Sequence, residues 1–263
     1  MDFNTIQVQL GECVAWIGLN RPEVRNALND SMIQELAEAF DWLNSRDDVR
    51  VIVLRGNGKA FCAGADLNYM KATSGYSFPQ NLADAERLSK LFQTIHFCAK
   101  AVIAVVHGAC IGGANGIVAA ADIVLAGRAT KFAFSEVRLG LSPATIAPFV
   151  IPKIGQTAAR ELMLTGRAFT ADEAKACHLV NAVVDEAAML DSERSYIDHF
   201  LQASPDALAE CKQLIRMVGH TAAPDSPLFG QTSMLIARQR VSKAGQEGMK
   251  AFLEKRKPEW NLT

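Results

Sequence analysis

A glycine-rich turn and a lone acid between residues 100 and 140 have the composition and spacing to handle an acyl group. The apolar run 101–106 enters the turn 108–113, and the chain reopens as a small-residue helix before Glu136 stands among apolar neighbours. A glycine turn that opens a helix presents backbone N–H groups to an anion or oxyanion. A carboxylic acid in apolar surroundings can have a raised pKa and exchange protons near neutrality. Together they indicate enolate chemistry on an acyl group.

A second glycine-containing turn, residues 60–67, follows the apolar run 51–54. Either turn could supply a backbone N–H at the carboxyl edge of a sheet, where open α/β folds place their ligands. Neither turn matches the dinucleotide-binding GxGxxG pattern or the phosphate-binding GxxxxGK[ST] pattern. Taken alone, each turn is equally consistent with glycine used only for a tight turn or close packing, and that interpretation stays open for both.

The segments that must position these turns alternate between strand-like and helix-like patterns. Polar and apolar residues alternate on both sides of Gly11-Glu12, in 6–10 and 13–19, which predicts a β-hairpin. Short, fully apolar runs are typical of parallel strands covered on both faces. Such runs occur at 51–54, 102–106 and 123–126. This alternation up to about residue 185 predicts an α/β fold with crossover connections.

Helix signals accompany these runs. Ser31 and Gln34 have capping-box spacing at the head of an apolar helical stripe. Gly75 and Pro79 within residues 68–90 suggest a mobile loop before a helix. Beyond residue 185 we expect only helices, at 186–203, 205–218, 227–242 and 245–257, with Pro205, Pro224 and Pro227 at their boundaries. This part reads as a helical appendage to the α/β core, of a kind that often packs against neighbouring subunits.

Composition excludes several classes of function. The net charge of −1 over 263 residues gives no general attraction to nucleic acid or to an anionic membrane. The six cysteines show no CxxC spacing, and no Asp/His/Glu grouping has metal-ligand spacing, so we expect free thiols and no metal site. The N-terminus has neither signal-peptide nor transit-peptide character, and no apolar run is long enough to span a bilayer. These features predict a soluble cytoplasmic protein. Lys255-Arg256-Lys257 is either a solvated helix tail or a phosphate contact.

Several motifs recur in the order found in one family. They are Asn20-Arg21-Pro22 with Asn26-Ala27-Leu28, the turns 60–67 and 108–113, Ala121-Asp122-Ile123, Phe134-Ser135-Glu136 and the segment 251–256. Over nearly its whole length the chain resembles the enoyl-CoA hydratase/isomerase (crotonase) superfamily. The resemblance implies a ββα-spiral core with an acyl-CoA site in residues 1–200 and a helical trimerisation region in 201–263. It also implies a homotrimer or dimer of trimers, with CoA as part of the substrate and no separate cofactor.

The resemblance also implies roles for individual residues. The backbone N–H groups of Ala65 and Gly113 would form an oxyanion hole, and Glu136 would carry the proton. Such a hole is required because a thioester α-carbon exchanges a proton readily only when the enolate-like oxygen is stabilised. The remaining residues fall where the family contacts the CoA nucleotide and pantetheine: Arg25, Ala27, Ala63, Asp66 and Leu67.

The departure from the family pattern lies at Gly116. Two-acid hydratases of the family carry a glutamate three residues beyond the oxyanion glycine, where this chain has Gly116. Asn115, Ser142 and His107 are the nearby polar residues, and each also has a structural interpretation. With Glu136 alone, the chemistry is either hydration or a proton shuttle between C2 and C4, as in single-acid isomerases.

The segment 135–155 resembles the branched-chain subgroup of hydratases, including bacterial 3-methylglutaconyl-CoA hydratase. Members of that bacterial group often have glycine at position 116 as well. A glutaconyl substrate carries a second carboxylate, for which Arg138 and Lys153 are candidates. We therefore expect reversible hydration of a 2-enoyl-CoA thioester. A double-bond isomerase and a non-catalytic acyl-CoA-binding protein are the alternatives.

Overall fold

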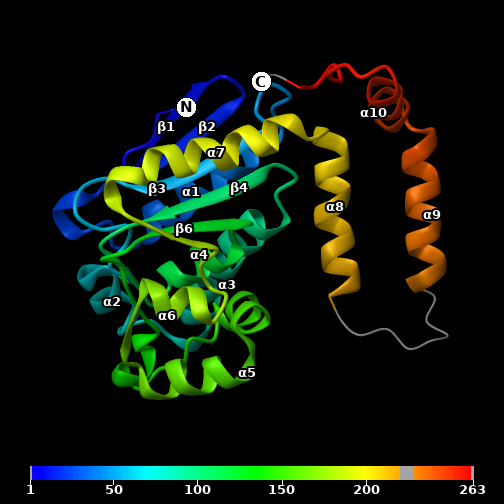
Figure 1. The fold of residues 1–263 in the computed structure, drawn as a ribbon. Helices are drawn as coiled ribbons and strands as arrows, with labels where there is room; N and C mark the ends of the chain where they lie inside the picture. The colour runs from blue at the N-terminus through cyan, green and yellow to red at the C-terminus, as the bar shows by residue number, and fades with distance from the viewer. Residues whose placement is uncertain (1, 220–227, 262–263) are drawn as a thin grey trace.

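The computed structural model describes residues 2–219 and 228–261, and the boundaries expected at Pro224 and Pro227 lie outside the described residues. A twisted six-stranded sheet forms the centre of the molecule (Figure 1). Its strands, in spatial order, are β1 (Ile6–Gly11), β2 (Val14–Leu19), β3 (Val51–Gly56), β4 (Ala101–Val106), β6 (Ile123–Gly127) and β9 (Ala182–Val184). Only β1 and β2 pair antiparallel; every other neighbouring pair is parallel. The predicted α/β architecture is confirmed.

The first hairpin turns one residue later than its sequence suggested. Gly11 pairs with Val14 at the end of the ladder, so Glu12 and Cys13 form the two-residue loop. Both have positive φ, 49° and 64°. Two central residues with φ > 0 are the mark of a type I′ turn, whose twist matches that of the flanking strands. The expectation of a glycine-led loop was wrong because the turn adopts left-handed backbone without glycine.

Helices on one side of the sheet begin where side chains satisfy their first N–H groups. Helix α1 (Asp30–Asn44) is capped by Asn29, whose side chain accepts from Met32 N at 3.0 Å, so the predicted Ser31 cap is wrong. The segment 68–90, expected as a mobile loop before a helix, does contain a helix, most of α3 (Phe78–Phe97), but its first residues form α2 (Leu67–Thr73) in place of a loop. Pro79 lies in the first turn of α3, where a missing N–H costs no helical hydrogen bond.

A second, three-stranded sheet lies beside the first. It contains β5 (Ala109–Ile111), β7 (Lys131–Ala133) and β8 (Ala168–Thr170), with β5 parallel to β7. The short helix α4 (Ala114–Ala120) connects β5 to β6, and the 3-10 turn η2 (Ser135–Leu139) follows β7 directly. The remaining elements before residue 203 are η1 (Pro22–Val24), α5 (Ala147–Thr165), α6 (Ala171–Ala176), η3 (Glu186–Ala188) and α7 (Met189–Gln202).

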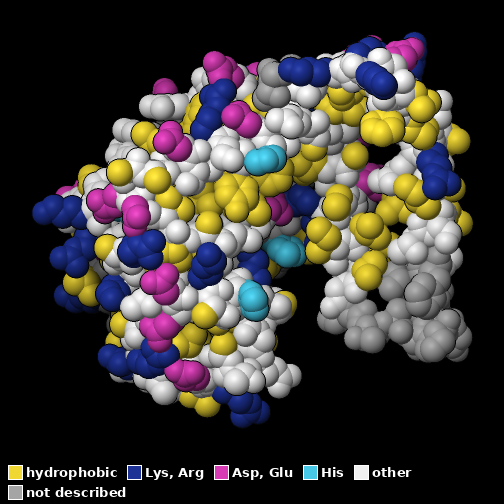
Figure 2. Space-filling model, viewed as in Figure 1, with side chains coloured by type: hydrophobic (Ala, Val, Ile, Leu, Met, Phe, Trp, Pro, Cys, Tyr) yellow, Lys and Arg dark blue, Asp and Glu magenta, His cyan; other side chains and the backbone are white. Residues whose placement is uncertain are grey.

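The C-terminal helices form an arm that stands away from the sheet (Figure 1). They are α8 (Pro205–Val218), α9 (Leu228–Val241) and α10 (Lys243–Leu253), the last beginning two residues before and ending four before the predicted range. Arg50 fastens the arm to the sheet by donating to the carbonyls of Leu201, Ala203 and Trp260. Figure 2 shows hydrophobic side chains over α8 and over the upper end of the arm, with a hollow between α8 and the rest of the molecule. A domain boundary at residue 200 stays a prediction.

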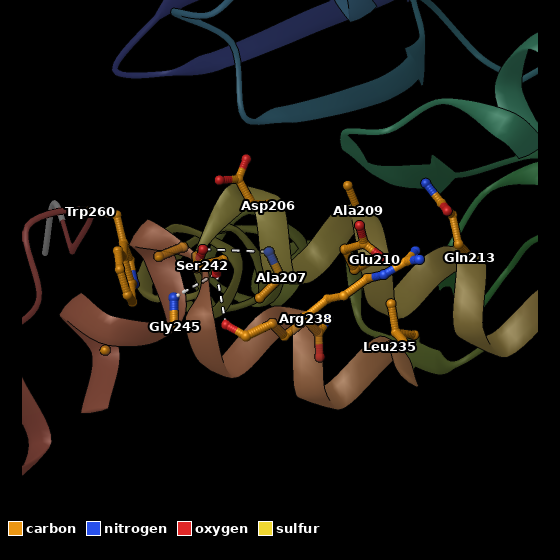
Figure 3. Close-up of a pocket in the computed structure, with 14 residues that line it drawn as sticks. Asp206, Ala207, Ala209, Glu210, Gln213, Leu235, Arg238, Ser242, Gly245 and Trp260 are labelled. Atoms are coloured by element: carbon orange, nitrogen blue, oxygen red, sulfur yellow. Dashed lines mark hydrogen bonds between the residues drawn. The ribbon is translucent and has the colours of Figure 1, made fainter. Parts of the chain in front are cut away.

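A groove of about 750 Å³ lies within this arm between α8, α9 and α10 (Figure 3). Asp206 and Glu210 line one side, and Arg238 and Trp260 lie across from them. None of the residues predicted to bind or transform an acyl-CoA lines this groove. Its size therefore says nothing about where the chemistry takes place.

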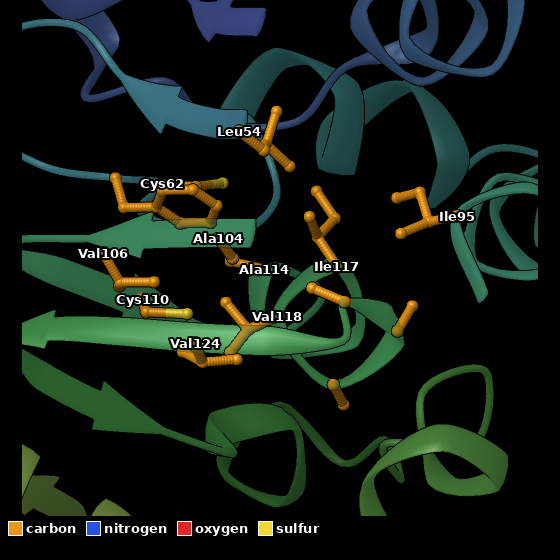
Figure 4. Packing of buried hydrophobic residues seen from close by; sticks show 14 of the residues in the cluster. Leu54, Cys62, Ile95, Ala104, Val106, Cys110, Ala114, Ile117, Val118 and Val124 are labelled. Atoms are coloured by element: carbon orange, nitrogen blue, oxygen red, sulfur yellow. The ribbon is translucent and has the colours of Figure 1, made fainter. Parts of the chain in front are cut away.

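The core lies on both faces of the parallel strands, as the fully apolar runs predicted. Ile52 and Leu54 of β3 face the larger cluster, which contains the buried residues of α1, α3 and α4 (Figure 4). Val51 and Val53 face the opposite cluster, where α7 contributes Ile197 and Leu201. Alternate residues of one strand point to opposite faces, so a buried strand needs apolar residues at every position.

Candidate active site

The two glycine-containing turns are joined by backbone hydrogen bonds. Phe61 N donates to His107 O at 2.8 Å, Cys62 N donates to Ala109 O at 2.9 Å, and Ile111 N donates back to Cys62 O at 3.2 Å. Gly64 has a φ of 96°, and a Cβ there would lie only 3.1 Å from Ile111 O. Glycine is therefore required at this position by both conformation and space. The segments from residues 60–67 and 108–113, predicted to act together, lie side by side.

The backbone N–H groups of Ala65 and Gly113 have no acceptor among the described residues. Leu28 lies against both: its backbone bridges to Ala65, and its Cδ1 would lie 3.5 Å from a Cβ at Gly113. Ala65 is exposed and Gly113 is half-buried, so both remain open to a ligand. Two backbone donors that are unpaired within the chain and lie at adjoining turns are suited to an outside acceptor.

Glu136 lies in η2, directly beside the glycine turn. Its Oε1 is 3.3 Å from the place where a Cβ of Gly112 would stand. Its Oε2 is buried and has no hydrogen-bond partner among the described residues. Burial raises the pKa of this carboxyl, although a backbone hydrogen bond within the residue opposes the shift. A buried carboxyl without a partner is a costly arrangement that is typical of a proton-transferring group.

The position of the absent second acid is filled by apolar side chains. A Cβ at Gly116 would lie 2.6 Å from both Ile146 Cγ2 and Phe92 Cζ. Both side chains are fully buried, and Phe92 packs edge-to-face against Phe149. These are closer than any ordinary carbon–carbon contact. A glycine at position 116 therefore leaves room for these two side chains, in addition to removing a carboxylate.

The residues matched to the family's CoA contacts surround Ala65. Arg25 O accepts from Ala63 N at 3.0 Å, and Ala27 is buried while Arg25 is exposed. Leu67 is 82% exposed, an unusual state for a large apolar side chain next to a candidate site. All five predicted residues thus lie on the turn that contains Ala65 or on the segment hydrogen-bonded to it, although no described contact assigns them a ligand. Their roles stay a prediction.

Asp66 has a structural function that its sequence did not reveal. Its carboxylate caps α2, accepting from Asn68 N and Tyr69 N, and pairs with Arg21 Nη2 at 2.8 Å. Burial by itself raises the pKa of Asp66, but the hydrogen bonds from Arg21 and from the helix outweigh burial and lower it. Arg21 also donates to Ala27 O at 2.7 Å, so it organises the loop around Ala65.

The other polar candidates have structural partners. His107 Nε2 lies 2.9 Å from Gly58 O, and the Asn115 side chain is held by backbone carbonyls. Lys153 donates to Ala121 O at 2.7 Å, and burial lowers its pKa to about 8. Arg256 pairs with Glu247 and Glu254, which favours the helix-tail interpretation of its basic run. Arg138 and Ser142 are exposed.

Two absences apply to residues 2–219 and 228–261. No group of three or more His, Cys, Asp or Glu side chains there could hold a metal ion. Over the same ranges, no helix combines the length and the apolar character needed to cross a membrane.

The chain was compared with known proteins and structures. The model of the enoyl-CoA hydratase/isomerase family matches residues 9–262. The crystal structure of an enoyl-CoA hydratase from Shewanella pealeana is 37% identical, covers 98% of this chain and 96% of its own, and superimposes with a TM-score of 0.95. AtuE of Pseudomonas aeruginosa is 30% identical, with 98% and 100% covered and a TM-score of 0.93. The fold is therefore that of the crotonases, as predicted.

Curated relatives agree with this fold. An enoyl-CoA hydratase from Mycobacterium tuberculosis is 32% identical over 92% of this chain and 91% of its own length. A mevalonyl-coenzyme A hydratase from Beauveria bassiana is 31% identical over 93% and 90%. With a family model covering residues 9–262 and relatives matched over about nine tenths of their length, the chain belongs to the enoyl-CoA hydratase/isomerase (crotonase) family.

Proposed function

We propose that this protein adds water reversibly across the double bond of a 2-enoyl-CoA thioester, with Glu136 as its single proton-carrying side chain. One observation carries the proposal: the half-buried Glu136 side chain lies beside Gly112 with a buried, unpartnered Oε2, next to two turns with unpaired N–H groups. The family model and the named hydratases among the relatives support the reaction class.

In the proposed mechanism, the thioester oxygen accepts hydrogen bonds from the N–H groups of Ala65 and Gly113. As a water oxygen attacks C3, negative charge develops on the thioester oxygen, where these fixed donors stabilise it. Removal of one such donor typically costs about 3–4 kcal/mol of transition-state stabilisation. Glu136 takes a proton from the attacking water and delivers one to C2 on the same face. A raised pKa suits a group that must both accept and return a proton near neutrality.

The CoA moiety would lie along the loop that carries Ala65. The exposed side chains of Arg25 and Leu67 offer a cation for the phosphates and an apolar surface for pantetheine. Ala27 and Ala63 are small, which lets the thioester arm approach the backbone closely. The Asp66 carboxylate is already used by α2 and Arg21, so we assign it to the shape of the loop.

The acyl group is proposed to be branched and similar to 3-methylglutaconyl. The resemblance of residues 135–155 to branched-chain hydratases supports this, as does a relative named for the branched mevalonyl group. We further propose a cytoplasmic homotrimer or dimer of trimers. Large exposed apolar side chains on the arm would be buried by such assembly, among them Ile215, Val241, Phe252 and Leu253. Light scattering of the purified protein tests the assembly, and a monomer would contradict it.

Incubation of the purified protein with a 2-enoyl-CoA in ¹⁸O-labelled water tests the reaction. We expect the label at C3 of a 3-hydroxyacyl-CoA product. The isomerase alternative draws on the same single acid, and it predicts conversion of a 3-enoyl-CoA to the 2-enoyl form without label. Tight binding of acyl-CoA with neither reaction would instead identify a non-catalytic binding protein. A panel of straight and branched substrates, ranked by kcat/KM, then tests the acyl preference.

A further inference from the structure

Asn115 connects the two halves of the proposed site through one buried amide. It lies in the first turn of α4 and is fully buried. Its Nδ2 lies 2.9 Å from Ala133 O, 3.1 Å from Gly112 O and 3.3 Å from Cys110 O. Its Oδ1 faces the thiol of Cys110, with Sγ at 3.5 Å. Every polar atom of the side chain therefore has a partner, as buried amides require.

The three carbonyls belong to two segments of the proposed site, the turn that carries the Gly113 N–H and the segment that leads to Glu136. Cys110 and Gly112 lead into the N–H of Gly113, whereas Ala133 ends β7 three residues before Glu136. Gly112 has a φ of 54° and no side chain, so its own conformation restrains the turn weakly. Asn115 thus ties the donor turn and the segment of the acid to the same rigid helix.

The backbone already links these segments, because β5 pairs with β7 up to Ile111 and Ala133. Gly112 N donates to Ala133 O at 2.9 Å, and Asn115 N donates to Gly112 O at 2.9 Å. The side-chain amide of Asn115 also donates to both of these carbonyls. The strand ladder ends at Ile111 and Ala133, so beyond it Gly112 and Gly113 are held by the Gly112 N–Ala133 O bond, the Asn115 N–Gly112 O bond and the Asn115 side chain.

We propose that Asn115 is a positioning residue that fixes the Gly113 N–H and the Glu136 carboxyl in relation to each other. This inference rests on the proposed function for its catalytic consequence, and on the contacts of the amide for the coupling itself. Asn115 touches no reacting atom. Its loss should therefore affect the transition state far more than the binding of the CoA ester.

The test compares Asn115→Ala and Asn115→Asp with Val118→Ala. The Asp variant keeps the size and the oxygen facing Cys110 but removes both N–H donors. Val118 is buried on the same helix, so its truncation controls for lost packing in α4 while the Asn115 amide stays in place. We expect kcat/KM for hydration to fall about 100-fold in both Asn115 variants, as displacement of catalytic groups by about 1 Å typically causes. KM should change little, and the acidic limb of the pH profile should move down as the Glu136 carboxyl becomes hydrated.

Amide hydrogen exchange provides a readout that does not need activity. In both Asn115 variants, residues 110–113 and 133–136 should exchange faster together, while Val118→Ala leaves both segments protected. If only one segment or neither responds, the coupling is refuted whatever the enzyme does. If kcat/KM per folded molecule and the pH profile stay at the parent values while both segments loosen, Asn115 is merely structural. A parent protein without hydratase activity refutes the proposed function and leaves the exchange result to decide the coupling.

Discussion

Substitution of Gly116 by alanine tests whether apolar packing has taken the place of a second acid. The added methyl group would lie 2.6 Å from Ile146 Cγ2 and Phe92 Cζ, and 2.8 Å from Phe92 Cε2. Carbon atoms in contact normally lie about 3.5–4.0 Å apart, so the methyl group overlaps two side chains by about 1 Å each. Both side chains are fully buried and have no solvent to move into.

The net effect follows from two opposing contributions. Overpacking of a well-packed core typically costs about 1–3 kcal/mol and sometimes more. Alanine gains up to about 1 kcal/mol over glycine within a helix. With two buried neighbours to displace, the overpacking cost is at the upper end, about 3 kcal/mol, so after the helix gain we expect Gly116→Ala to lower the free energy of unfolding by about 2 kcal/mol. For a chain of this size, that corresponds to a fall in Tm of about 2–4 °C per kcal/mol.

Urea unfolding of the parent and four variants measures this effect. Gly230→Ala in α9 is the matched control, because a Cβ there meets nothing within 4 Å, and it should be neutral or slightly stabilising. Ile146→Ala alone should destabilise by about 2–5 kcal/mol through the cavity it leaves. Combined with Gly116→Ala it should cost less than the sum, since the new methyl group enters that cavity. A Gly116→Ala protein at least as stable as the parent would refute the packing argument.

Three further predictions concern charged groups. The native state holds the Glu136 proton more tightly than the unfolded chain does, so ionisation of this carboxyl lowers the free energy of unfolding near neutral pH. Glu136→Gln should therefore be more stable than the parent at neutral pH. This advantage should disappear as the pH falls to 4.5, the ordinary pKa of a glutamate. Burial lowers the pKa of Lys153 to about 8 from 10.5, so the unfolded chain binds more protons between these values and stability should rise across that range; Lys153→Met should remove this slope in urea titrations. Arg50→Ala should lower stability by about 2–3 kcal/mol through loss of its charge-assisted bonds and should speed limited proteolysis between Leu201 and the arm; unchanged cleavage would contradict its anchoring role.

The sequence predicted the sheet and the two turns because the signals for both, apolar runs and glycines, are contained in short stretches of chain. The apolar runs of β3, β4 and β6 identify buried parallel strands, since a strand covered on both faces needs an apolar residue at every position. The glycine turns identify a backbone site, because only glycine permits the close approach of Gly64 to Ile111 O. The pairing of the two turns, in contrast, depends on contacts between residues about fifty positions apart, and the family resemblance was needed to predict it.

What the sequence did not predict depends on such long-range partners. The structural use of Asp66 requires Arg21, and the role of Asn115 requires Ala133 to lie within reach of its amide. The hairpin loop shifted to Glu12 and Cys13 because strand pairing overrode the preference of Gly11 for turns. Helix α2 and the early start of α3 were missed because Gly75 and Pro79 signal a loop locally, whereas Ser77 and Gln80 cap α3 there.

The rate of hydration by Glu136→Gln tests the central claim most directly. Glutamine keeps the shape of the side chain but exchanges no proton near neutral pH, so kcat/KM for a 2-enoyl-CoA should fall by about 10²–10⁴-fold. The affinity for a saturated acyl-CoA should stay within about threefold, because the oxyanion donors and the CoA contacts remain. Glu186→Gln, an exposed substitution in η3 and outside both turns, is the control and should behave as the parent. A Glu136→Gln enzyme that hydrates its substrate at a rate close to that of the parent would contradict the single-glutamate account.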